Sequence, residues 1–261
     1  MISLLSLIAL PAVKSAPALE PYELTVPGTV VKIKMIPVEG GTIKIRGKEV
    51  TVKPFYIAET ETPWEAYDAF LSSGPPSKPY DQSQFAADAV ARPSKSYILP
   101  DLNWGHRGYP VINVSFTSVT MFCRWIAQTT KTAIRLPHEA EWEFVYRAGG
   151  GGDKTDKATA EKLGWVASNA GDMTHPIKKK APNKLGIYDM LGNVGEWGTD
   201  LEGKDVLLGP TFQDKLEDVN AGRRQYYDPL WQEEDPQIPK SRWWLSDGPF
   251  CGFRMVCEPS G

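Results

Sequence analysis

The sequence predicts a loop-rich globular fold rather than a helical bundle or a parallel α/β sheet. Three observations support this. Among 261 residues there are 23 glycines and 22 prolines, and nine tryptophans are available to hold irregular segments together. Period-two alternation comes first and helical patterns follow it. The length suits one large domain or two small ones. We expect the domain at 31–258, after an extended lead-in at 19–30.

Charge argues against nucleic acid as a partner. Lys and Arg number 29 against 32 Asp and Glu, the net charge is −3, and the basic residues form no stripe. A nucleic-acid-binding domain normally concentrates its basic residues on one face. A protein or a glycan stays open as the partner, and we expect a monomer.

Residues 1–18 have the pattern of a secretory signal peptide. They are apolar from Ile2 to Val13, a run too short to span a bilayer. Small residues follow, and Ala16-Pro17-Ala18 fits an A-x-A cleavage site. We expect an exported protein (periplasmic, extracellular or on the cell surface) with no membrane span after cleavage. An apolar N-terminal segment of a cytoplasmic protein, or a start codon placed too far downstream, is the alternative.

The strand signals begin at Val31. VKIKMIPV at 31–38 alternates apolar and charged residues, Gly40-Gly41 predicts a turn, and alternation resumes at 42–47 and at 50–59. These runs predict an antiparallel meander of two or three strands. A further strand is expected near 205–214, and a final strand near the C-terminus carries Phe253, Met255 and Cys257 on one side.

Helix signals follow at three places. Thr62 can cap a first helix, Pro63 suits its first position, and Glu65 completes a capping box. A second helix after the short strand 110–115 buries one face. A third helix begins within 135–143 and ends near the glycines at 149–152. The buried face of the second helix is Val119, Phe122, Cys123 and Ile126.

The stretch 183–197, NKLGIYDMLGNVGEW, is the best candidate for a site. Gly186, Gly192 and Gly195 are too closely spaced for a regular helix, and the apolar residues between them are unlike a linker. We predict an irregular, packed loop of the kind that holds a ligand, a metal or a tight backbone crossing. The proline-rich stretch 74–109 is long enough to be functional or to form a lid.

Six ordered motifs resemble the formylglycine-generating (sulfatase-modifying factor) family over about 31–258. The resemblance implies a single α+β domain, a variant of the C-type-lectin-like fold with little regular secondary structure. The motifs are MIPVEGGTIKI, FYIAETETPWEAYDAF, PVINVSFTSVTMFCRW, RLPHEAEWEFVYRAGG, NKLGIYDMLGNVGEW and GFR.

The resemblance also implies an enzymatic activity, but this chain lacks the residues on which that activity depends. The family oxidises a cysteine of a sulfatase to formylglycine, using copper held by two cysteines that follow a Gly-Gly-Ser motif. The matching positions here are Asp214 and Val219, within 208–219. Neither side chain is a soft thiolate ligand, and no cysteine lies between Cys123 and Cys251. We therefore expect no copper and no catalytic residue from this motif.

The same resemblance implies structural Ca²⁺ in the 183–197 loop. Its ligands would be the carboxylates of Asp189 and Glu196 and the backbone carbonyls of Gly192 and Val194. A hard cation that takes six to eight oxygens suits such a loop, and a packed turn capped by Asp189 is the alternative. Gly195 stands where the family usually has Trp, so we expect a looser loop.

A second calcium site of the family would begin at Asn169, with the carbonyl of Ala170. Its acidic ligand has no clear match, although Asp172 is near. The family also has a disulfide that starts at the position of Cys123. Its partner position is Met255 here, so we predict a Cys123–Cys257 bridge that leaves Cys251 free.

The remaining titratable residues indicate structural roles. The three histidines have neither the H-x3-H nor the H-E-x-x-H spacing, and His138 replaces a helix cap poorly. Glu139 and Glu143 are one helical turn apart, as on a solvated or salt-bridged face. We expect Arg254 of the GFR motif to pair with a carboxylate.

These observations favour an exported binding or accessory module of a sulfated-glycan or sulfatase-related system, without the copper-cysteine site. An oxidase of protein or peptide maturation that uses other residues is the second hypothesis. A lectin-like carbohydrate binder is the third, and it rests on fold analogy and the many tryptophans.

Overall fold

A computed structural model describes residues 19–73, 96 and 98–259. The predicted signal peptide at 1–18 and most of the 74–109 stretch lie outside the described residues. None of the helices in the described part of the chain combines the length and apolar composition that crossing a membrane requires.

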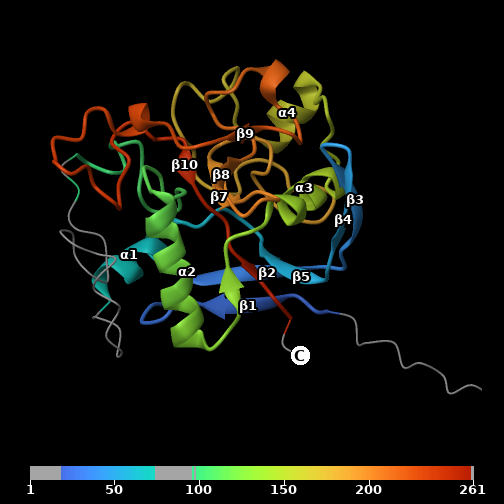
Figure 1. The fold of residues 1–261 in the computed structure, drawn as a ribbon, viewed down its shortest axis with the longest axis horizontal. Helices are drawn as coiled ribbons and strands as arrows, with labels where there is room; N and C mark the ends of the chain where they lie inside the picture. The colour runs from blue at the N-terminus through green and yellow to red at the C-terminus, as the bar shows by residue number, and fades with distance from the viewer. Residues whose placement is uncertain (1–18, 74–95, 97, 260–261) are drawn as a thin grey trace, which may run out of the picture.

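A five-stranded sheet forms the floor of the domain (Figure 1). Its order is β1-β2-β5-β11-β6, and all four pairings are antiparallel. The alternation in β2 gives the expected result, because Ile33 and Met35 are buried while Lys32 and Lys34 are exposed. The predicted lead-in at 19–30 is part of the domain, because it contributes strand β1 to this sheet. The strands are β1 (Tyr22–Thr25), β2 (Lys32–Val38), β5 (Phe55–Ala58), β11 (Val256–Cys257) and β6 (Ile134–Arg135).

The predicted meander is wrong in its pairing. Strands β3 (Gly41–Ile45) and β4 (Lys48–Val52) form a separate two-stranded hairpin, and β2 pairs with β5 across it. Gly40 explains the break: its φ is +75° and a Cβ there would lie 2.2 Å from the Val52 carbonyl oxygen. The tight backbone approach turns the chain out of the sheet.

A four-stranded sheet carries the second half of the chain. Its order is β10-β7-β8-β9, with β10 and β7 parallel. The predicted C-terminal strand is therefore wrong as one element, because its first part joins this sheet and its last part, β11, joins the floor. The strands are β10 (Cys251–Gly252), β7 (Gly195–Thr199), β8 (Asp205–Leu208) and β9 (Arg224–Gln225).

The three predicted helices are confirmed, and α4 is added by the structure. Helix α2 buries Val119, Phe122, Cys123 and Ile126, as its spacing predicts, and Ser115 Oγ accepts from the Ser118 N–H at 3.1 Å. The helices are α1 (Trp64–Ser72), α2 (Phe116–Thr130), α3 (Glu139–Ala148) and α4 (Lys157–Leu163), with 3₁₀ turns η2 (Leu216–Asp218) and η3 (Pro229–Gln232).

The predicted capping box of α1 is wrong. Pro63 occupies the N-cap position, the Thr62 hydroxyl has no partner, and Glu65 Oε1 instead accepts from the Gly108 N–H at 2.8 Å. Glu65 therefore ties the 99–109 loop to the helix start.

Aromatic rings fill the main core between the floor sheet, α1 and α2. Tyr67, Phe70, Phe122 and Phe253 contact one another with ring centroids 5.2 to 6.4 Å apart. Such pairs stabilise a fold beyond their buried area. A second core lies under the β3–β4 hairpin and α3, centred on Trp142. The 183–197 loop runs between the two cores.

Candidate functional site

Three carboxylates and one guanidinium meet in the interior beside the 183–197 loop. Glu61 precedes α1, Asp189 lies in the loop, Glu196 lies in β7, and Arg254 lies between β10 and β11. The parallel pairing of β7 with β10 places Gly252 opposite Glu196 and so brings Arg254 to it. At most 1% of each of the four residues is exposed to solvent.

Arg254 holds Glu196. Its Nη2 lies 2.8 Å and its Nε 3.0 Å from Glu196 Oε1. The guanidinium also donates to the carbonyls of Ala58 at 3.0 Å and Tyr188 at 2.8 Å. Trp142 Nε1 donates to Glu196 Oε2 at 2.8 Å. The expected pairing of Arg254 is confirmed, and its partner is one of the predicted calcium ligands.

The other two carboxylates have different partners. Glu61 accepts from the Val194 N–H at 3.0 Å and from Asn193 Nδ2 at 2.8 Å. Burial raises the pKa of Glu61 well above its ordinary value, and the charges of Asp189 and Glu196 add to the rise. Burial also raises the pKa of Asp189, to about 6. One guanidinium cannot neutralise three buried carboxylates; the charge of Lys180 also acts on Asp189, and a proton or a bound cation would offset the remainder.

Asp189 is the carboxylate that fits a cation. Its Oδ2 accepts from the Lys178 N–H at 2.9 Å, while its buried Oδ1 has no hydrogen-bond partner. Gly192 has φ +142°, and a Cβ there would lie 2.0 Å from the Trp165 carbonyl oxygen. Only glycine permits this path of the loop. An unpaired carboxylate oxygen is a donor of the kind that Ca²⁺ accepts.

Within the first predicted ligand set the residues thus play unequal parts. Asp189 offers a free oxygen, whereas both oxygens of Glu196 accept from Arg254 or Trp142. Gly192 and Val194 would contribute only backbone oxygens. Among the described residues, no group of three or more His, Cys, Asp or Glu side chains is arranged to hold a metal ion.

The second predicted ligand set does not fit a cation. Asn169 Oδ1 accepts from the Val166 N–H at 2.8 Å, and the Ala170 carbonyl accepts from His175 Nε2 at 2.7 Å. Asp172 is exposed, with φ +59°. The Asn169 amide oxygen and the Ala170 carbonyl thus each already have a protein partner.

The expectation that Gly195 loosens the loop is wrong. A Cβ at Gly195 would lie 2.7 Å from Leu207 and 3.3 Å from Thr211. The side chains of Leu207 and Thr211 occupy the space that a larger residue at 195 would need. The loop is therefore close-packed at this point.

The two positions that the resemblance matches to copper cysteines, 214 and 219, hold structural residues. Asp214 Oδ1 accepts from Arg223 Nε at 3.0 Å and Nη2 at 2.7 Å, and Oδ2 accepts from the Thr211 N–H at 2.8 Å. Val219 is fully buried against Ala160 and Val166. The segment is thus folded around an ion pair and a small apolar cluster.

The predicted Cys123–Cys257 disulfide is contradicted. All three cysteines are buried free thiols. Cys257 Sγ donates to the Glu258 carbonyl at 3.3 Å and interacts with Tyr22, so it has other partners. Burial raises the pKa of Cys123 and of Cys251. These thiols therefore stay protonated at neutral pH.

The charged residues of RLPHEAEWE have the structural roles that were expected. Arg135 holds Glu141 with two bonds of 2.8 and 2.7 Å. Arg224 bridges Glu139 at 2.9 Å and Glu143 at 2.7 Å. His138 Nδ1 lies 2.7 Å from Thr199 Oγ1, and the His138 N–H donates to Glu141.

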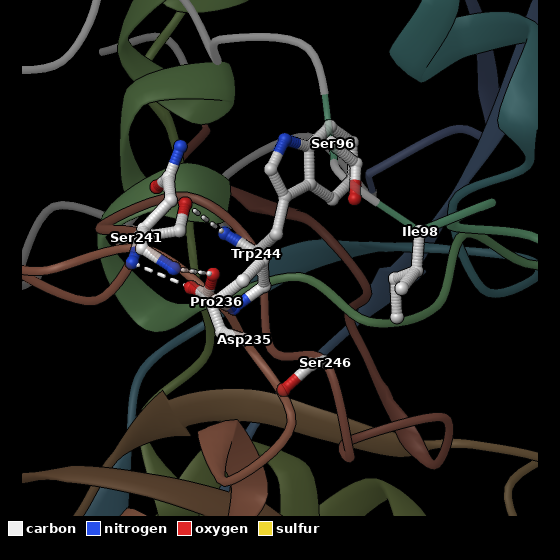
Figure 2. Close-up of a pocket in the computed structure, with 8 residues that line it drawn as sticks. Ser96, Ile98, Asp235, Pro236, Ser241, Trp244 and Ser246 are labelled. Atoms are coloured by element: carbon white, nitrogen blue, oxygen red, sulfur yellow. Dashed lines mark hydrogen bonds between the residues drawn. The ribbon is translucent and has the colours of Figure 1, made fainter.

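A groove of about 530 Å³ lies beside β4, and three of the residues that line it, Arg135, Glu141 and His138, have the partners given above. A hollow of about 20 Å³ lies between Ile98, Pro236 and Trp244 (Figure 2). That volume suits one water molecule.

Sequence reasoning missed two features. The first is Glu61: the ETETPW stretch (59–64) resembles a helix start, and that pattern does not show that Glu61 is buried. His106 lies between Asp101 at 2.9 Å and Asp68 at 2.8 Å, and it stacks on Trp64. No spacing rule links residues that far apart in the chain.

Comparisons with known proteins agree with this fold. The domain family described as "Sulfatase-modifying factor enzyme 1-like domain" matches residues 23–258. The chain is 32% identical to the formylglycine-generating enzyme of Mus musculus over 117 residues, which are 39% of this chain and 30% of the mouse protein. It therefore matches less than a third of that relative's length.

Two further similarities cover more of the chain. The chaperone protein LppX of Paenibacillus barcinonensis is 27% identical over 213 residues, 65% of this chain and 72% of that protein. The solved structure of Treponema denticola variable protein 1 superposes with a TM-score of 0.66 at 19% identity, covering 93% of this chain and all of that one. That likeness shows the fold alone. With the family match over residues 23–258, the chain belongs to the sulfatase-modifying factor enzyme 1-like domain family.

Proposed function

We propose that this chain is an exported binding or accessory domain that does not oxidise cysteine at a copper centre. One observation carries the proposal: Asp214, bonded to Arg223, and the buried Val219 stand at the two positions of the copper cysteines. A carboxylate committed to an ion pair and a valine cannot replace two thiolates.

Two further observations support an accessory role over an oxidase built from other residues. In the groove beside β4, Arg135 holds Glu141 and His138 contacts Thr199, so these three side chains already have partners. A relative that covers most of this chain bears the name of a chaperone, which is an accessory function.

The test is a direct assay for formylglycine. Purified protein is incubated with Cu(I), oxygen and a cysteine-containing sulfatase peptide, and the peptide is examined by mass spectrometry. We expect unmodified peptide, with the mouse formylglycine-generating enzyme as the positive control. Conversion above the no-protein blank would overturn the proposal.

Export is tested separately. If residues 1–18 are a signal peptide, N-terminal sequencing of the protein from its native compartment gives Leu19 as the first residue. A mature chain that starts at Met1 would contradict export by this route.

We also propose that Asp189 holds a structural Ca²⁺ together with loop carbonyls. The unpaired, buried Oδ1 and the excess of carboxylates over guanidinium support this. A cation here would offset the negative charge that Arg254 leaves uncompensated.

A further inference from the structure

Exposed apolar side chains concentrate on one segment, 226–238. Seven large hydrophobic residues are exposed in the described part of the chain, and four of them lie here. We call this segment the 226–238 surface. Exposed apolar side chains that gather on one surface mark interaction sites on soluble proteins, and the bond from the Tyr227 hydroxyl to Gln232 ties Tyr227 to the 3₁₀ turn that carries Leu230. The four are Tyr226 (38% exposed), Tyr227 (45%), Leu230 (61%) and Ile238 (97%).

The same surface is acidic. Asp228, Glu233 and Glu234 are exposed, and within the described residues none of their carboxylates forms an ion pair. Lys240, at the end of the segment, directs its ammonium to the carbonyls of Glu233 at 3.0 Å and Asp235 at 2.5 Å. The three carboxylates therefore face solvent, where the cationic groups of a partner can reach them.

Buried polar side chains hold the surface in one shape. Gln232 Nε2 donates to the carbonyls of Ser241 at 2.6 Å and Trp244 at 2.7 Å, and its Oε1 accepts from the Tyr227 hydroxyl at 2.8 Å. The Ser241 N–H donates to Asp235 at 2.7 Å (Figure 2). A surface fixed before binding loses little conformational entropy when a partner arrives.

We propose that the 226–238 surface docks a cationic segment of a partner protein that carries aromatic or aliphatic side chains. Lys or Arg of the partner meets Glu233 and Glu234, and its apolar side chains cover Leu230 and Tyr227. Sulfated glycans and anionic membranes are repelled by the same carboxylates. A neutral sugar carries no positive charge that could pair with these carboxylates. The inference deepens the proposed accessory function, because it gives that function a partner of stated chemistry.

The test uses three fluorescein-labelled peptides of equal length, composed of Lys and Trp, Glu and Trp, or Lys and Ser. Binding to the full domain is followed by fluorescence anisotropy. We expect the Lys–Trp peptide to bind at least about tenfold more tightly than the other two. In E233Q/E234Q, and separately in L230S/I238S, its Kd should rise about fivefold or more.

Matched controls sit elsewhere on the surface. E49Q/E217Q removes two exposed carboxylates outside the segment, and V30S removes an exposed apolar side chain. Both should bind the Lys–Trp peptide like the wild type. Equal loss in the controls, unchanged binding in both segment variants, equal affinity for the Lys–Ser peptide, or no binding would each overturn the inference. Formylglycine formation in the copper assay would instead remove the accessory role and leave the peptide result standing.

Discussion

Glu196 and Arg254 form an ion pair inside the protein, with 2.8 Å between Oε1 and Nη2 and at most 1% of either side chain exposed. The pair connects the glycine-rich loop to the segment between β10 and β11, and thereby couples the two sheets. Removing one partner of a buried pair leaves an uncompensated charge, which is much more costly than losing a surface pair.

Arg254→Met keeps most of the side-chain volume and leaves three buried carboxylates without their guanidinium. We expect the free energy of unfolding to fall by about 3–5 kcal/mol, measured by urea denaturation. Lys32→Ala, which breaks an exposed pair with Glu23, is the control and should cost less than about 1 kcal/mol. Comparable small losses in the two variants would contradict a structural role for Arg254.

Asp189 predicts a pH dependence that calcium removes. Its folded pKa of about 6 lies above the ordinary value of 3.8. The folded state therefore binds the proton more tightly, and the stability this gives is full below pH 3.8 and lost as the pH rises through 6. In chelator, this group should lower stability by up to about 3 kcal/mol across that window, and Asp189→Asn should flatten the trend.

Calcium should then raise the melting temperature at pH 7 but have less effect below pH 6, where the proton competes for Asp189. A ligand that binds only the folded state must stabilise it. Thermal melts with Ca²⁺ and with chelator measure this, and Asp189→Asn is the matched variant. An identical melting temperature in both buffers at pH 7 would contradict the calcium proposal.

Asp214 and Arg223 should behave as one unit. Arg223→Gln leaves the nearly buried Asp214 carboxylate without its cation and should cost about 1–3 kcal/mol of stability. Asp214→Asn should cost a similar amount. In the double variant the losses should fall short of their sum by about 1 kcal/mol. Full additivity would show that the two side chains do not interact.

The three thiols should be free but shielded. The intact mass should be the same with and without reduction, after alkylation under denaturing conditions, with three labels in each case. In the native state, labelling by a thiol reagent should be slow because burial keeps Cys123 and Cys251 protonated and inaccessible. Two labels fewer without reduction would establish a disulfide.

His106 should titrate above the usual histidine range. Its bonds to Asp68 and Asp101 raise the pKa against the opposing effect of burial. The stability from these bonds is present below pH 6.5 and is lost as the pH rises through the raised pKa. Because 42% of the side chain is exposed, the contribution should stay under about 1 kcal/mol. An NMR titration of the imidazole, compared with Asp68→Asn and Asp101→Asn, measures the shift.

Local patterns predicted individual elements better than their pairing. The 3.6-residue spacing in α2 correctly identified its buried face, and alternation correctly identified β2. Alternation carries no information about which strands are neighbours, so the separate β3–β4 hairpin and the division of the C-terminal strand between two sheets were missed.

The sequence alone determined that no cysteine lies between Cys123 and Cys251, so no arrangement of the chain can supply a thiolate from the 208–219 segment. It also determined that the 183–197 loop must be irregular, because its glycines exclude a helix. The tertiary structure decided which side chains pair with one another. It paired Glu196 with Arg254, left Asp189 Oδ1 unpaired and gave Glu61 its place in the cluster. Coulombic energies and burial depend on distances between residues far apart in the chain, and only the folded backbone sets those distances.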